Sequence, residues 1–155
     1  MKNKLHHDAE LFWKCRKIVL SEHSNIIKII AQAIMNRITR FYNAVIPNQA
    51  TIRGVPITPH GLIGIFISKQ AVLGKNVTIY QNVTIGSNQK ADSKNFGSPI
   101  IGDNVVIGAN SCVVGGVKIG NNTFIGAGTS VAVDVPDNST VVNGKVRIIH
   151  RKEML

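Results

Sequence analysis

Residues 101–126 read IGDNVVIGANSCVVGGVKIGNNTFIG, and an aliphatic residue returns in this stretch at nearly every sixth position. The same step runs through most of the second half of the chain. Its members are Ile67, Leu73, Ile79, Ile85, Ile101, Ile107, Val113, Ile119, Ile125 and Val131. A period of six fits neither an amphipathic helix nor a half-buried strand. It is typical of a hexapeptide parallel β-helix, in which each short strand forms one side of a coil and stacked coils bury the repeated aliphatic side chain.

A second set of residues, small or β-branched, follows most of these aliphatics by four positions and is expected to lie in the same core. Its members are Ala71, Val77, Val83, Val105, Ser111, Val117, Thr123, Thr129 and Val135. The step breaks once, between Ile85 and Ile101, where the chain holds one hexapeptide plus an insertion. The inserted segment 87–98 is polar and rich in turn formers, which predicts a loop ejected from the scaffold. Such loops commonly carry function.

The composition limits the kinds of partner. The 155 residues suit one domain, and 18 Lys and Arg against 8 Asp and Glu leave a formal net charge of +10. The basic residues are spread along the chain without a nucleic-acid motif, so we expect no nucleic-acid binding. An anionic small molecule is the simpler partner. The N-terminus lacks the apolar region of a signal peptide, and Cys15 and Cys112 lie far apart, so a reducing cytoplasm with free thiols is expected.

The chain divides into a helical segment 1–43, a β-helix 44–140 and a C-terminal strand with a basic tail, 141–155. A short helix is predicted from Glu10 to Leu20, and a second helix follows Ser24 as N-cap. Its apolar face is predicted to contain Ile26, Ile30, Ile34, Ile38 and Phe41, with Ile27, Ala31 and Met35 beside them. We expect this segment to cover the end of the β-helix or a partner subunit. Peripheral contact with a membrane surface is the less favoured alternative.

His60 is the candidate catalytic residue of the β-helix. It lies in Thr58-Pro59-His60-Gly61, between degenerate and regular repeats. Histidine is the natural base for removing a proton from an alcohol, although a lone histidine in a loop is more often without function. The one other histidine of this half is His150, too few for a three-histidine metal site, so no metal is expected.

Three segments carry a resemblance to a known family: Pro59-His60-Gly61, Ala71-Val72-Leu73-Gly74-Lys75-Asn76-Val77-Thr78-Ile79 and Gln81-Asn82-Val83-Thr84-Ile85-Gly86. They resemble the serine acetyltransferase group of hexapeptide O-acetyltransferases, over roughly residues 46–149. The resemblance implies a left-handed parallel β-helix, a homotrimer, and acetyl-CoA bound in the groove between adjacent subunits. It also implies that His60 deprotonates the acceptor hydroxyl, which then attacks the thioester directly.

Further site residues follow from the same resemblance. The backbone N–H of Ser87 would stabilise the oxyanion. Residues implied to contact the coenzyme are Gly86, Ala109, Ala127, Arg147, Arg151 and Lys152. Ala109 and Ala127 are small enough to let the pantetheine pass, and the basic residues would meet the phosphates. Asp92 and Ser98, in the ejected loop, are candidates for binding the acceptor.

The departures from the family bear on the acceptor. Serine acetyltransferases have an aspartate that supports the catalytic histidine where this chain has Asn-Ala-Val-Ile-Pro at 43–47. Pro59 replaces a second aspartate, and Gly97-Ser98 replace an Arg-His pair. Because those groups help to recognise a zwitterionic amino acid, we predict a sugar hydroxyl of a surface polysaccharide or its precursor as acceptor, as in the short enzymes that resemble this chain. L-serine is the alternative, and a non-catalytic β-helix scaffold is the alternative of another class.

Overall fold

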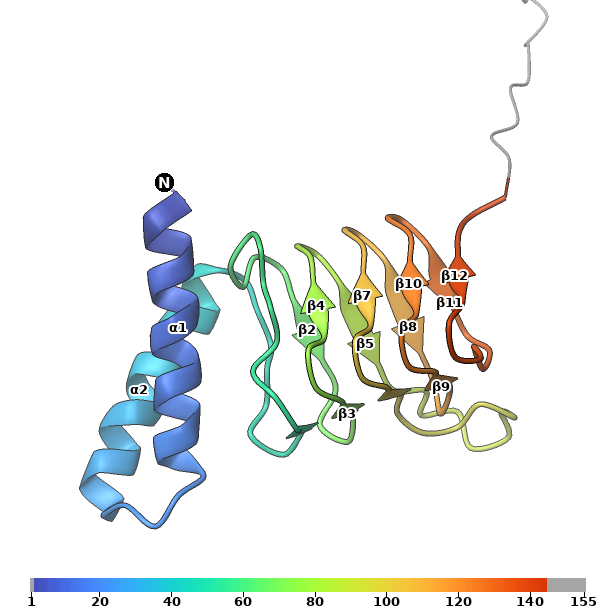
Figure 1. The fold of residues 1–155 in the computed structure, drawn as a ribbon. Helices are drawn as coiled ribbons and strands as arrows, with labels where there is room; N and C mark the ends of the chain where they lie inside the picture. The colour runs from blue at the N-terminus through green and yellow to red at the C-terminus, as the bar shows by residue number, and fades with distance from the viewer. Residues whose placement is uncertain (1, 145–155) are drawn as a thin grey trace, which may run out of the picture.

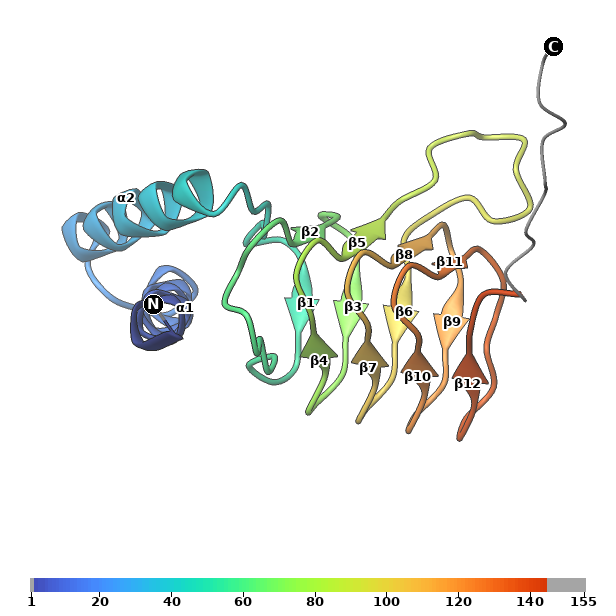
Figure 2. The ribbon, with the colours of Figure 1, turned by 90° about the horizontal axis from the view of Figure 1, so that it is seen from above.

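The structure is a computed structural model that describes residues 2–144. A hairpin of two helices, α1 (Lys2–Val19) and α2 (Asn25–Phe41), covers the N-terminal end of a stack of β-coils (Figures 1 and 2). The strands are short and follow one another around the coils: β1 (Thr51–Ile52), β2 (Phe66–Ile67), β3 (Val72–Leu73), β4 (Thr78–Ile79), β5 (Thr84–Gly86), β6 (Ile100–Ile101), β7 (Val106–Ile107), β8 (Cys112–Val114), β9 (Lys118–Ile119), β10 (Phe124–Ile125), β11 (Ser130–Val131) and β12 (Thr140–Val141).

The strands form three parallel sheets of four, in the orders β1-β3-β6-β9, β12-β10-β7-β4 and β11-β8-β5-β2. From β2 to β11 every third strand returns to the same sheet, so each coil is a triangle and each aliphatic of the six-residue step stacks on its equivalent in the next coil. Ile79 pairs with Ile107, and Ile107 with Ile125. All the aliphatics of the step are buried, as predicted, and so are the small and β-branched residues that follow them.

The ends of the repeat region also match the expected irregularity. Val45 and Ile57 each make only an isolated bridge, to Phe66 and Thr78, because Pro56 and Pro59 interrupt regular pairing around Ile57. At the other end, the described part of the chain finishes with a paired strand. After the turn at Asp137 and Asn138, strand β12 pairs with β10 and closes the last described coil.

One row of corners is stabilised by a ladder of asparagine side chains. Each asparagine has a positive φ, which this residue tolerates better than most. Its amide donates to the asparagine of the next coil at 3.0–3.1 Å. The ladder consists of Asn76, Asn104, Asn122 and Asn138. At the preceding position Asp103 and Asp137 accept backbone N–H groups from the neighbouring coil, which gives these two acids a structural role.

Helix α1 is longer than predicted and begins near the N-terminus, at Lys2. Tertiary contacts explain the extra length, because Leu5 packs against the turn that contains Gly61. Further along the helix, Phe12 and Trp13 are buried. The buried guanidinium of Arg16 donates to the carbonyl oxygens of Asn48 and Ala50, at 3.2 and 2.7 Å, and so joins the helix to the first coil.

Helix α2 exposes much of the face that was predicted to be buried. Ala31, Met35 and Ile38 are buried, whereas Ile26 and Phe41 are 72% and 70% exposed. The prediction is right for these three buried residues and wrong for Ile26 and Phe41. Isoleucines lie on several sides of this helix, so contact with α1 rather than periodicity selected the buried side. Ser24 does precede the helix, but its side chain makes no capping hydrogen bond. Within residues 2–144, neither helix combines the length and apolar character that crossing a membrane requires.

The two helices are joined near their open ends by a hydrogen bond that should make stability depend on pH. The hydroxyl of Tyr42 donates to Asp8 Oδ2 at 2.6 Å. Burial, together with this bond and the charge of Asp8, raises the pKa of Tyr42 to about 12.

We expect Tyr42 to contribute stability in full below its ordinary pKa of about 10, and to lose that contribution as pH rises towards 12. In that window the unfolded chain releases the phenolic proton while the folded chain retains it. Urea unfolding of wild type and Tyr42→Phe, measured from pH 8 to 11.5, isolates this effect from other titrations. The stability difference between the two proteins should shrink above pH 10, and a constant difference would contradict the assignment.

Candidate active site

The turn that carries His60 begins one edge of the prism. Residues 58–64 join Ile57, in the sheet of β4, to Phe66 in β2, and the corners 80–82, 108–110 and 126–128 stack beyond them. Backbone hydrogen bonds join each corner to the one before it. The N–H groups of Asn82, Asn110 and Gly128 donate to the carbonyl oxygens of Ile63, Gln81 and Ala109, respectively. This row of corners runs along the upper edge of the stack in Figure 1. Three predicted site residues, His60, Ala109 and Ala127, therefore share one edge.

Two glycines allow the His60 turn to form. Gly61 has a φ of +67°, and a Cβ there would lie 3.1 Å from the carbonyl oxygen of Leu5 in α1. Gly64 has a φ of +62°, and a Cβ there would lie 2.1 Å from Asn82 Oδ1. Both positions require a backbone that side chains disfavour as well as a close approach. The turn is thus held between α1 on one side and the next coil on the other.

The imidazole of His60 points to the next coil. Its Nδ1 lies 2.6 Å from Oε1 of Gln81. The ring of Tyr80 meets the imidazole edge to face, with centroids 5.6 Å apart and planes at 81°. The residue is exposed, and Nε2 makes no hydrogen bond with residues 2–144. A nitrogen that is oriented, accessible and without a partner in the described chain has the geometry of a general base.

Four other predicted residues, Gly86, Ser87, Asp92 and Ser98, lie on another edge or in the loop that leaves it. Gly86 ends β5, and Ser87 opens the ejected loop, whose base is a pair of hydrogen bonds between Asn88 and Gly97. The loop leaves the opposite, lower edge of the stack in Figure 1. Asp92 is exposed and pairs with Lys90 at 3.5 Å. Ser98 accepts a hydrogen bond from Ser68 at 3.4 Å.

One chain therefore does not bring the whole predicted site together. The turn with His60 precedes β2, at one edge of the sheet formed by β2, β5, β8 and β11. The segment with Ser87, Asp92 and Ser98 follows β5, at the other edge of the same sheet. Arg147, Arg151 and Lys152 lie outside the described residues. Among residues 2–144, no cluster of three or more His, Cys, Asp or Glu side chains is placed to hold a metal ion.

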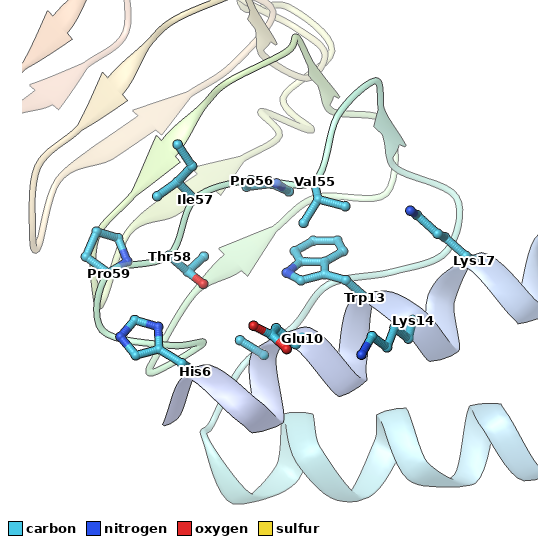
Figure 3. Close-up of a pocket in the computed structure, with 11 residues that line it drawn as sticks. His6, Glu10, Trp13, Lys14, Lys17, Val55, Pro56, Ile57, Thr58 and Pro59 are labelled. Carbon is cyan, nitrogen blue, oxygen red and sulfur yellow. The ribbon is translucent and has the colours of Figure 1, made fainter. Parts of the chain in front are cut away.

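A hollow of about 340 Å³ lies behind the His60 turn, between α1 and residues 55–59. Figure 3 shows Trp13 of α1 opposite Val55 and Thr58, with Glu10 and Lys14 on the same helix. The walls are mainly apolar, and the buried indole N–H of Trp13 has no hydrogen-bond partner among the described residues. His60 itself is not among the residues that line the hollow.

Gln81 and Tyr80 are site residues that sequence reasoning missed. Gln81 was noted only as part of the Gln-x-Val-Thr-Ile-Gly segment. In the regular coils, a residue pairs with the residue three hexapeptides further along the chain, as Phe66 pairs with Thr84. Because the 58–64 turn is longer than a regular corner, His60 meets a residue 21 positions on. The extra residues of that turn are the feature of the sequence that could have predicted the contact between His60 and Gln81.

Comparisons with known proteins agree with the repeat and the fold. The family described as bacterial transferase hexapeptide (six repeats) matches residues 98–132. The serine acetyltransferase of Staphylococcus aureus is 40% identical over 116 residues, which cover 74% of this chain and 53% of that protein. Serine acetyltransferase 3, mitochondrial, of Arabidopsis thaliana is 34% identical over 149 residues, or 96% of this chain and 37% of that protein.

Solved structures give the same result. The serine acetyltransferase of Neisseria gonorrhoeae superposes with a TM-score of 0.69 at 31% identity, covering 96% of this chain and 54% of that one. The serine acetyltransferase isoform 3 of Entamoeba histolytica, solved in complex with cysteine, superposes with a TM-score of 0.66 at 31% identity, covering 80% and 43%. The chain thus spans about half, or less, of the length of these relatives.

These findings define the class first: a mainly β protein built as a hexapeptide-repeat β-helix, with the left-handed architecture that the family resemblance implied. Within that class, the chain is similar to serine acetyltransferases over 74–96% of its own length. The relatives described above are serine acetyltransferases, so they do not support the predicted likeness to enzymes of surface-polysaccharide biosynthesis.

Proposed function

We propose that this chain is an acetyl-CoA-dependent O-acetyltransferase in which His60 is the general base. The observation that carries the proposal is the orientation of the imidazole on an exposed edge: Nδ1 is hydrogen-bonded, and Nε2 has no partner within the described range 2–144. The similarity to serine acetyltransferases over most of the chain supports the same reaction class.

In the proposed reaction, Nε2 of His60 removes the proton from the acceptor hydroxyl as its oxygen attacks the thioester carbonyl carbon of acetyl-CoA. The tetrahedral oxyanion is stabilised by the backbone N–H of Ser87, which follows the last residue of β5. The C–S bond then breaks, the acetyl group stays on the acceptor oxygen, and the thiolate of CoA takes the proton from His60. No covalent enzyme intermediate is needed.

We propose that the site is composite and that the protein is a homotrimer. Both proposals are supported by the position of the candidate residues, because His60 and Ser87 lie at two different edges of one sheet. A neighbouring subunit that offers its Ser87 edge to His60 would complete the site. Acetyl-CoA would then lie between the two subunits, with its pantetheine beside Ala109 and Ala127. Both alanines lie in the corners that stack along the His60 edge, where the backbone N–H of Gly128 donates to the carbonyl oxygen of Ala109. Gly86, next to Ser87, would border the reacting thioester.

For the acceptor, the serine acetyltransferase relatives favour L-serine over the sugar that the sequence first suggested. A sugar hydroxyl is the second candidate because Pro59 and Gly97-Ser98 replace groups that would recognise a zwitterion. In that case Asp92 and Ser98 of the loop are the proposed acceptor ligands.

A thiol-release assay with acetyl-CoA separates the two acceptors. We expect L-serine to raise the rate of CoA release at least about 10-fold above the rate without acceptor, because correct placement of one hydroxyl converts a slow hydrolysis into an oriented transfer. D-serine is the matched control, and nucleotide sugars and capsule oligosaccharides form the competing panel. A larger rate with a sugar would select the second acceptor. No stimulation by any hydroxyl compound would contradict the proposed activity.

A further inference from the structure

The partner of His60 is an amide rather than a carboxylate. Gln81 follows Tyr80 in the coil beyond the His60 turn, and its Oε1 lies 2.6 Å from Nδ1. The backbone carbonyl oxygen of Gln81 accepts a hydrogen bond from the N–H of Asn110 at 3.1 Å, so the residue is fixed in the stack of corners. The Asn-Ala-Val-Ile-Pro segment at 43–47, by contrast, contains no carboxylate that could take this role.

An amide oxygen can only accept a hydrogen bond, so this contact requires the proton of a neutral His60 to be on Nδ1. The lone pair is then on Nε2, the nitrogen that makes no hydrogen bond with residues 2–144. Free histidine prefers the opposite tautomer, with the proton on Nε2, which could not accept a proton there. The bond to Gln81 therefore selects the form of the imidazole that can act as a base at the open edge.

Tyr80 completes the support of the ring. Its edge-to-face contact restricts rotation of the imidazole about its axis, while Gln81 fixes which nitrogen faces outwards. Tyr80 is the titratable side chain in contact with the ring. From the packed helix, α1 brings Leu5 against the turn and His6 to the hollow beside Pro59. Among residues 2–144, the neighbours of the ring therefore bring no carboxylate to Nδ1.

We propose that Gln81 is the positioning residue of the active site, which holds His60 in the Nδ1–H tautomer in place of a carboxylate. This inference rests on the proposed function, because a tautomer matters only where His60 acts as a base. A neutral partner also predicts distinct behaviour with pH. A carboxylate stabilises both the Nδ1–H form and the protonated imidazole, whereas an amide stabilises the first without adding charge.

The kinetic test uses two substitutions of nearly the same size. Gln81→Met keeps the length of the side chain but removes the acceptor, and it should lower kcat about 10-fold, the scale expected when a supporting hydrogen bond is lost, with little change in KM. Gln81→Glu restores an acceptor, so activity should return at high pH. Its pH–rate profile should show an acid limb moved to higher pH, because the new carboxylate favours protonated His60.

Gln49→Met is the matched control, since Gln49 is an exposed glutamine in the turn before β1, away from the His60 edge. Full activity is expected for this variant. A loss of activity in Gln81→Met that Gln81→Glu does not rescue at any pH would mean a packing role and would overturn the inference. Full activity of Gln81→Met would also overturn it.

A second readout does not depend on turnover. In protein labelled with ¹⁵N-histidine, the ring-nitrogen shifts of His60, assigned by comparison with His60→Asn, should show the Nδ1–H tautomer of the neutral ring. Gln81→Met should shift the population towards Nε2–H, and Gln49→Met should not. An Nε2–H tautomer in the wild type would overturn the inference by itself. If the tautomer is as expected but His60→Ala remains active, the proposed function fails while the structural assignment of Gln81 stands.

Discussion

His60→Ala is expected to lower kcat at least about 100-fold, the usual scale for removing a general base. The side chain lies on the surface at the edge of the coils, so its loss should leave the fold intact. Steady-state thiol release with the preferred acceptor measures the effect, and circular dichroism with size-exclusion chromatography checks that secondary structure and assembly are unchanged.

His23→Ala is a suitable control for this experiment, because His23 is an exposed histidine in the turn between α1 and α2. It should retain wild-type turnover. Turnover within a few-fold of wild type in His60→Ala would remove His60 from the mechanism. The hypothesis of a non-catalytic scaffold would then gain support, since no other histidine lies in the described part of the β-helix, residues 44–144.

Ile107→Ala should destabilise the fold by about 2–5 kcal/mol, as large-to-small substitutions in a packed core do. Ile107 is fully buried and stacks between Ile79 and Ile125 in the middle of its sheet. The column cannot close over the lost atoms, because the aliphatics above and below are held by strand pairing on both sides.

The neighbouring residue provides the control. Val106 precedes Ile107 in β7 and faces outwards, so Val106→Ala should cost well under half as much. Urea unfolding of the two variants, monitored by circular dichroism, gives the comparison. Equal losses of stability would mean that the six-residue step does not mark the core.

Much of the scaffold could be predicted from local sequence. The aliphatic step predicted the buried columns, and the slip between Ile85 and Ile101 predicted the loop, because a parallel β-helix places equivalent residues above one another at constant separation. His60 was selected by its chemistry, by its position between irregular and regular repeats, and by the resemblance of the surrounding segments to serine acetyltransferases. Its role as a base stays a proposal until activity is measured.

The helices show where local pattern ends. The isoleucines of α2 do not mark one side of the helix, and contact with α1 buried Ala31 and Met35 while leaving Ile26 exposed. Similarly, α1 extends to Lys2 because Leu5 packs on the His60 turn, a contact between residues far apart in sequence.

The sequence by itself determined that this chain coils into a triangular prism, because a six-residue repeat of aliphatics has one efficient way to bury them. Only the tertiary structure decided which side chain supports His60 and which candidate residues share its edge. The long 58–64 turn displaces His60 from the regular register and brings it to Gln81. The width of one sheet separates it from Ser87 and the loop. Both outcomes depend on how successive coils stack in space, which no local period specifies.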